Sequence, residues 1–231
     1  MIFESISGTL EKIIKALATK FENRLKCLIL YGSWAKGNAR EDSDIDLLAV
    51  FNHVDAEVRK VTQDLSWVDE REITLLIAGV DEFQNEKLPL YTAIKREGRI
   101  IWGDADLSVY PDPPELKYSQ FFERSREFEA RKVEMAEKLL EKNFRSGIPE
   151  ICFIAAKHAI QAALAMKGEG YSSKMAVLLP LTEKYFGKEI SEAFQRLFAI
   201  YMKTEYQLQD LSEEEAGLVL GYAKEILKVY Q

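Results

Sequence analysis

The residue pattern of this chain changes at a short proline-rich segment, and this change limits the possible folds more than any other feature. Up to about residue 103, β-branched apolar runs alternate with helical stretches, whereas from about residue 115 everything has helical periodicity. Prolines lie between the two parts at positions 111, 113 and 114, and proline lacks the N–H donor that regular structure requires. We therefore predict an α+β chain with a mixed-sheet domain over residues 1–105, a linker over 106–118 and a helical domain over 119–231.

Each part has a distinct set of predicted elements. In the first part, apolar residues at helical spacing from Leu10 to Phe21 mark an amphipathic helix. Apolar runs predict strands over residues 27–31, 44–51, 72–78 and 99–102. In the second part, helices are predicted over residues 115–144, 149–167, 173–186, 189–208 and 213–230. The short connections between these helices favour an antiparallel bundle.

Composition excludes some classes of function. The net charge is −7, and neither half of the chain is basic, so nucleic acid is not an expected partner. No unbroken apolar run approaches the roughly 18 residues of a membrane helix, and the N-terminus lacks a signal-peptide pattern. Cys27 and Cys152 fit no metal-ligand spacing and are expected to be buried free thiols. A cytoplasmic location is the expectation.

The chemically informative segment covers residues 30–47. It begins with an apolar strand that ends at Gly32-Ser33, where a phosphate can approach backbone N–H groups, the Ser33 hydroxyl and the start of a helix. It ends with Asp44 and Asp46 on a second strand. Side chains two positions apart on a strand share a face and lie roughly 6–7 Å apart, so the two carboxylates can share a pair of hard cations. Each short pattern alone is typical of a solvated turn or strand start, but together they favour a metal and triphosphate site.

This segment resembles the Gly-Ser…Gly…Ser-Asp-x-Asp-Leu signature of the polymerase-β-type nucleotidyltransferase superfamily, and most of all its minimal and kanamycin-nucleotidyltransferase-like members. The resemblance implies that Asp44 and Asp46 are catalytic and bind Mg²⁺, with two ions expected, and that ATP or another nucleoside triphosphate is the substrate. It implies nucleotide binding by five residues: Gly32, Ser33, Lys36, Arg40 and Ser43. For Lys36 and Arg40, solvated loop charges are an equally good interpretation.

The family resemblance also implies a third carboxylate on a later strand. In the strand over residues 72–77, Thr74 is a candidate for that position, and Glu72 shares its face with a longer side chain. Asp69 and Glu70 are further candidates from the preceding loop. We favour Glu72 as a catalytic residue, with the absence of a third carboxylate as the alternative.

The helical part resembles HEPN domains over residues 151–174 and 201–230, on weaker motifs. Ribonucleases of that family carry an Arg followed by a His near the penultimate helix, and residues 203–206 of this chain contain neither. His158 lies on a helix rich in small residues, where a packed or half-exposed histidine is expected. We therefore do not predict RNA cleavage by the helical part. We predict that it binds the acceptor or forms a homodimer.

The predicted function is Mg²⁺-dependent transfer of a nucleoside monophosphate from a nucleoside triphosphate, by preference ATP, to a hydroxyl acceptor with release of pyrophosphate. The acceptor is a small molecule or a protein, and an RNA end is disfavoured by the acidic charge. The alternative is a nucleotide-binding regulatory or antitoxin-like module with weak or no transferase activity. The third carboxylate discriminates between the two hypotheses.

Overall fold

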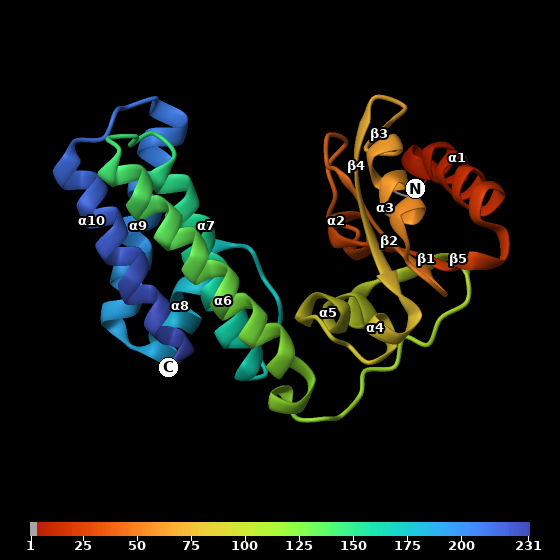
Figure 1. The fold of residues 1–231 in the computed structure, drawn as a ribbon. Coiled ribbons are helices and arrows are strands. Elements are labelled where there is room, and N and C mark those ends of the chain that lie inside the picture. Colours follow the sequence, from red (N-terminus) through yellow and green to blue (C-terminus); the bar gives the residue numbers. More distant parts are fainter. Residues whose placement is uncertain (1–3) are drawn as a thin grey trace. The chain divides into compact units, whose positions relative to one another are not determined.

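The computed structural model describes the backbone of residues 4–231 and the side chains of residues 5–60 and 64–231. The chain forms two compact units, the first ending at Pro111 and the second covering Asp112–Gln231 (Figure 1). Each unit has its own hydrophobic core.

The first unit combines one sheet with helices on both of its faces. Its elements are α1 (Glu4–Phe21), the 3-10 turn η1 (Glu22–Arg24), β1 (Leu25–Tyr31), α2 (Gly32–Lys36), β2 (Ile45–Phe51), α3 (Ala56–Asp64), β3 (Trp67–Val68), β4 (Arg71–Gly79), α4 (Val80–Gln84), α5 (Pro89–Glu97) and β5 (Arg99–Gly103). The strand order is β3-β4-β2-β1-β5. β2 pairs in parallel with β4, and the other pairings are antiparallel. The predicted mixed sheet and α+β class are confirmed.

The alternation of side chains along β1 explains why both faces of the sheet are covered. Leu28 and Leu30 pack into the core that contains the apolar face of α1, whereas Cys27 and Ile29 pack into the core on the opposite face. That second core also contains Phe83 of α4 with Tyr91 and Ile94 of α5. β2 is buried on both faces as well, so the strand that leads from the Asp44/Asp46 motif is held firmly at the centre of the sheet.

The second unit is helical. Its elements are α6 (Pro114–Glu141), α7 (Ile148–Met166), α8 (Met175–Phe186), α9 (Lys188–Gln207), α10 (Glu213–Ile226) and the 3-10 turn η2 (Leu227–Tyr230). These helices match the predicted spans closely. The small residues Ala155, Ala156, Ala159, Ala162 and Ala163 of α7 are buried and allow its neighbours to approach closely.

One helix of the second unit is apolar enough to be compared with a membrane span. α7 has a window of mean hydropathy 1.2, and 72% of that window is buried inside the structure. A core helix of a bundle has these properties, and the burial of α7 against α6, α9 and α10 accounts for its composition.

Candidate active site

The turn between β1 and α2 requires a glycine at its first position. Gly32 directly follows β1, has a φ of +68° and begins α2. A Cβ atom at this position would lie 2.0 Å from Oδ2 of Asp46, so any side chain would displace that carboxylate. Gly37 then ends α2 in a left-handed conformation, with a φ of +75°, and turns the chain back toward β2. The predicted strand–turn–helix–strand arrangement is present.

The two motif aspartates lie at the start of the central strand. Asp44 immediately precedes β2, and Asp46 is paired with Tyr31 of β1 and with Thr74 of β4. The Thr74 hydroxyl donates a long hydrogen bond of 3.5 Å to Oδ2 of Asp44. Burial, and to a lesser degree the neighbouring Asp44 carboxylate, raises the pKa of Asp46 to about 6. The charged form of Asp46 is therefore disfavoured in the absence of a cation.

Ser33 presents a polar atom with no partner. Its hydroxyl oxygen is buried and makes no hydrogen bond to any residue that the structure describes. A buried polar group without a partner destabilises a fold by about 1–3 kcal/mol unless something else satisfies it. The position of this hydroxyl, one residue after Gly32 at the start of α2, fits a ligand that supplies the missing partner.

These features fit a site for Mg²⁺ with a triphosphate. Carboxylate oxygens are the ligands that Mg²⁺ prefers, and Asp44, just before β2, and Asp46, two positions later within it, supply them. A bound cation would offset both the burial and the neighbouring Asp44 charge that raise the pKa of Asp46. The side-chain-free surface of Gly32 and the unpartnered Ser33 hydroxyl add groups suited to phosphate. Two carboxylates leave room for phosphate oxygens and water to complete the coordination of the ion.

The loop that carries Asp44 is braced by residues that the sequence analysis missed. Trp34 of α2 donates from Nε1 to the Ser43 carbonyl at 3.2 Å, and the Ser43 hydroxyl accepts from the Arg40 N–H at 2.9 Å. Arg71 of β4 donates to the Glu41 carbonyl at 2.7 Å and lies over the Trp34 ring, 5.7 Å from its centroid. Ser43 thus stabilises the loop in this structure. A tryptophan directly after Gly-Ser was the available signal for such a brace.

The two predicted basic phosphate contacts differ in their surroundings. Lys36, in the last turn of α2, forms a 2.6 Å ion pair with Glu97 of α5. The side chain of Arg40 is exposed in the loop that leads to Asp44. Their roles toward a nucleotide stay predictions.

The structure separates the candidates for the third carboxylate. Among the residues that the structure describes, no three His, Cys, Asp or Glu side chains lie close enough to hold a metal together, so Glu72 does not form a triad with Asp44 and Asp46. Glu72 is exposed on β4, opposite Trp67 of β3. Its assignment as a proton acceptor stays a prediction.

The other two candidates form the turn between β3 and β4. Asp69 and Glu70 both have positive φ, 52° and 61° respectively. Asp69 pairs with Lys12 at 2.5 Å and accepts from the Thr9 hydroxyl at 3.2 Å, both on α1, and these contacts lower its pKa. The turn is therefore fastened to α1.

In the helical unit, the histidine of α7 has a structural partner. His158 Nδ1 lies 3.1 Å from Oε1 of Glu129, a buried residue of α6 that also pairs with Lys132 at 2.8 Å. The expectation of a packed, half-exposed histidine agrees with this arrangement.

The first unit matches a family model of known proteins. The family model described as "Polymerase beta, Nucleotidyltransferase" matches residues 11–106. A protein of Methanocaldococcus jannaschii named as a protein adenylyltransferase is 44% identical over 41 residues, which are 18% of this chain and 41% of that protein. The match thus spans less than half of the relative.

Two solved structures show similarity to this chain. The crystal structure of a spectinomycin adenyltransferase from Enterococcus faecialis, with ATP and spectinomycin, has a TM-score of 0.51 at 16% identity and covers 96% of this chain and 99% of that chain. A nucleotidyltransferase-like protein from Exiguobacterium sibiricum has a TM-score of 0.45 at 11% identity, covering 95% of this chain and 74% of that chain.

The likeness to the spectinomycin enzyme extends over both units and concerns the fold alone. The second unit is helical, and its resemblance to HEPN domains stays a prediction. The matched residues 11–106 contain Gly32, Ser33, Asp44 and Asp46 in the geometry described above. The polymerase beta nucleotidyltransferase family model thus matches the mixed-sheet unit of this chain, including these four residues.

Proposed function

We propose that this protein transfers adenylate from ATP to a hydroxyl acceptor in a Mg²⁺-dependent reaction that releases pyrophosphate. One observation supports this most: the Asp46 carboxylate lies against Gly32, whose lack of a side chain leaves space beside it, and the next residue, Ser33, carries a buried, unpartnered hydroxyl. This arrangement is complete only when an anion and a cation are present together, and a metal-bound triphosphate is such a ligand.

Each residue has a defined part in the proposed reaction. Asp44 and Asp46 would hold Mg²⁺, which when bound neutralises charge on the triphosphate and on the departing pyrophosphate. The Ser33 hydroxyl and the N–H groups at the start of α2 would donate to phosphate oxygens. The acceptor oxygen forms a bond to the α-phosphorus as the bond to pyrophosphate breaks. The acceptor proton passes to a base, for which Glu72 is the predicted residue.

Two similar proteins support a proposal for the class of acceptor. One relative is named for adenylylating a protein, and the similar crystal structure contains spectinomycin, a small molecule. A hydroxyl on a small molecule or on a protein side chain is therefore the proposed acceptor, and we propose that the helical unit contributes to its binding.

The test uses radiolabelled ATP with Mg²⁺ and a fractionated cell lysate. Wild-type protein is expected to label one fraction, small-molecule or protein, and to release pyrophosphate in equal amount. The variant Asp44→Asn/Asp46→Asn should lose at least about 1,000-fold of the labelling, because it removes both metal ligands. The matched control is Asp42→Asn, an exposed carboxylate of the same loop, which should retain full activity. Equal labelling by the Asp44/Asp46 variant would exclude the proposed site.

A second candidate function is a nucleotide-binding regulatory module. The observation that favours it is the grouping of only two carboxylates at the site among the described residues. Glu72→Ala discriminates between the two functions: lost pyrophosphate release with retained ATP binding supports the enzyme. If the wild type binds Mg²⁺-ATP and releases no pyrophosphate with any lysate fraction, the binding module is the better description.

A further inference from the structure

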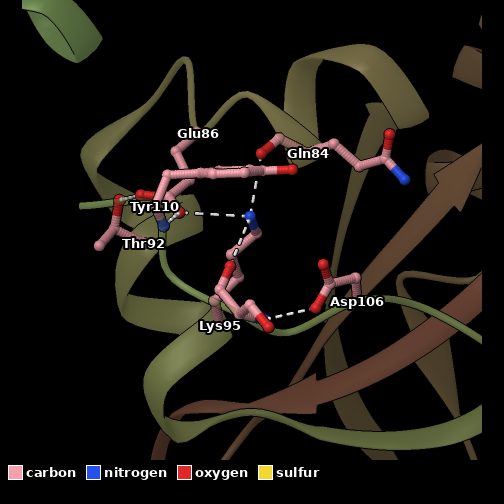
Figure 2. Close-up of polar contacts among 7 residues, drawn as sticks. Gln84, Glu86, Thr92, Lys95, Asp106 and Tyr110 are labelled. Atoms are coloured by element: carbon pink, nitrogen blue, oxygen red, sulfur yellow. Dashed lines mark hydrogen bonds and ion pairs between the residues drawn. The ribbon is translucent and has the colours of Figure 1, made fainter. Parts of the chain in front are cut away.

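The first half of the predicted linker is bound to the mixed-sheet unit. After β5 ends, the Asp104 N–H donates to the Lys26 carbonyl at 3.4 Å, and the apolar side chains of Ala105 and Leu107 pack against the core formed with α4 and α5. Next along the chain, the Ser108 carbonyl and the Tyr110 N–H bond to a buried ion pair. Figure 2 shows this pair with Tyr110. The segment from 104 to 110 is therefore part of this unit.

Lys95 of α5 is the cation of that buried pair. Its side chain is 1% exposed, and its Nζ donates to the Gln84 carbonyl at 2.9 Å, to Oε1 of Glu86 at 3.2 Å and to the Ser108 carbonyl at 3.0 Å. An ammonium group has three protons, so this set of acceptors satisfies it. Nζ also lies 4.6 Å from the centroid of the Tyr110 ring. Figure 2 draws both side chains.

Glu86 is the anion, and its side chain is fully buried. Oε2 accepts from the Thr92 hydroxyl at 2.8 Å, and Oε1 accepts from the Tyr110 N–H at 2.8 Å in addition to Lys95. Glu86 adopts a φ of 49°, an uncommon conformation for a residue with a side chain. A buried ion pair gives little net stability over an apolar pair, but it requires specific partners. Here those partners include backbone groups of Ser108 and Tyr110, which sets the register of the segment.

The connection that remains between the two units is short. Residues 111–113 separate Tyr110 from the first residue of α6, Pro114. Two of these three residues are proline, and Pro113 is extended, with φ −56° and ψ 142°. Such a segment resembles polyproline II, which is semi-rigid.

The helix that carries Lys95, α5, also contacts α2, the helix that begins at Gly32. α5 carries Lys95, and two residues later Glu97, which pairs with Lys36 of α2 at 2.6 Å. The start of the linker and the helix that follows Gly32 are therefore both attached to α5.

We propose that Lys95 and Glu86 are positioning residues for the transfer reaction: they fasten residues 108–110 to the mixed-sheet unit, so that residues 111–113 form the pivot between the two units. The role in transfer rests on the proposed function. The fastening itself does not, because it concerns only the path of the chain. An acceptor bound by the helical unit then meets the nucleotide within a restricted range of orientations, which raises the rate of reaction.

The test replaces both members of the pair in the full-length chain. Lys95→Met/Glu86→Leu exchanges the buried charges for apolar side chains, which proteins often tolerate, and removes the partners of Ser108 and Tyr110. Hydrogen exchange of the peptide 104–110 is expected to accelerate at least about tenfold, with α1 and β2 unchanged. The matched control, Lys87→Met/Asp81→Asn, removes an exposed ion pair of 2.7 Å close in sequence and should leave this exchange unaltered.

A distance measurement reports on the pivot. Spin labels at Ala16→Cys and Ala130→Cys, both exposed, place one label on each unit, while Cys27 and Cys152 are 0% exposed and stay unlabelled. The distance distribution is expected to broaden in the Lys95/Glu86 variant. The rate of labelling of the acceptor fraction should fall at least about tenfold with the KM for ATP unchanged, because the nucleotide site is intact.

A second variant avoids the buried pair altogether. Inserting Gly-Gly-Ser after Pro111 lengthens the pivot, so it should broaden the distances and slow transfer while exchange of residues 104–110 stays slow.

Three outcomes overturn the proposal. Slow exchange or an unchanged distance distribution in the folded double variant would exclude the fastening. Wild-type transfer rates in both variants, with the linker loosened or lengthened, would exclude the positioning role. A wild-type protein that transfers nothing refutes the proposed function and with it the role in transfer, whereas the exchange and distance measurements still decide the fastening.

Discussion

The mixed-sheet unit contains one polar cluster around Lys95 and Glu86 and another around Gly32. They differ in whether the described residues supply hydrogen-bond partners for their polar groups. Around Lys95 and Glu86, the ammonium group has three acceptors and both carboxylate oxygens have donors. Around Gly32, the Ser33 hydroxyl has no partner among the described residues, and the pKa of Asp46 is raised to about 6 by burial and by Asp44.

The contrast separates a cluster whose partners all come from the chain from one that we propose binds a ligand. Polar groups satisfied within the chain make a segment follow one path, and their loss is expected to reduce stability. Polar groups left unsatisfied indicate a missing ligand, and their loss is expected to reduce binding or activity with little effect on stability. The predictions below test this distinction with matched pairs of substitutions.

The largest expected effect on stability is at Lys95. Lys95→Met leaves the Glu86 carboxylate buried without its cation, which should lower the free energy of unfolding by about 3–5 kcal/mol. Lys95→Met/Glu86→Leu should recover most of that loss. Trp34, Trp67 and Trp102 all lie in the first unit, so tryptophan fluorescence during urea unfolding reports this unit alone. Equal losses in the single and double variants would contradict the structural interpretation of this cluster.

The next effect separates backbone strain from contact with Asp46. Gly32→Ala and Gly37→Ala both place a side chain on a residue with positive φ, +68° and +75°, and each should destabilise by about 1–2 kcal/mol. Only at Gly32 does the new Cβ meet Asp46; nothing lies within 4 Å of a Cβ at Gly37. Transfer should therefore fall at least about 100-fold in Gly32→Ala beyond the change in Gly37→Ala. The measurement is labelling at a temperature where both variants are folded, and equal activities would count against the carboxylate's role.

A smaller effect compares two buried serine hydroxyls. Ser125 Oγ lies 2.7 Å from the Tyr230 hydroxyl, so Ser125→Ala should destabilise the helical unit by about 1–3 kcal/mol through the lost hydrogen bond. Ser33→Ala removes an unpartnered hydroxyl and should leave stability unchanged or slightly raised. It should weaken Mg²⁺-ATP binding about tenfold, because hydrogen bonds to charged groups contribute about 1.5–3 kcal/mol. Circular dichroism melts and calorimetric titration measure the two quantities, and unchanged ATP affinity would remove Ser33 from the site.

The smallest effect concerns Glu215, a carboxylate whose pKa is lowered by its surroundings, whereas that of Asp46 is raised. The Ser212 N–H, and then Lys203, lowers the pKa of Glu215 from 4.5 to about 2. Because the folded pKa lies below the unfolded one, Glu215 stabilises the protein above pH 4.5, and this contribution is lost as the pH falls from 4.5 to about 2. Glu215→Gln should flatten the pH dependence of helical-unit unfolding in that window, as followed by circular dichroism. An unchanged slope would contradict the assignment.

The sequence was sufficient for the parts of the fold that depend on local pattern. The strands around the Gly32-Ser33 and Asp44/Asp46 motif, and the ends of the five long helices, follow from apolar periodicity and from glycine and proline positions. The sequence did not identify the third carboxylate, because it did not show how the residues of β4 align with those of β2. Only the parallel pairing of β2 with β4 places Thr74 beside Asp46.

The buried cluster could not be predicted for a similar reason. Lys95 lies in a short amphipathic helix, where a lysine normally faces solvent. Its burial depends on the segment from 104 to 110, which packs back against α5. The prolines after this segment led us to predict a linker for the whole region from its composition. Contacts between distant segments decided both cases.

The ion pair between Lys36 and Glu97 has a consequence for ligand choice. Both side chains are about half exposed, 45% and 49%, so the pair contributes about 0–1 kcal/mol to stability. A ligand that recruits Lys36 must exchange one anion for another, and a single negative charge gains almost nothing from that exchange. A triphosphate carries several charges and still benefits. If Lys36 contacts the ligand as predicted, Glu97 raises the charge that a ligand needs to recruit it, which favours a triphosphate over a weakly charged molecule of the same shape.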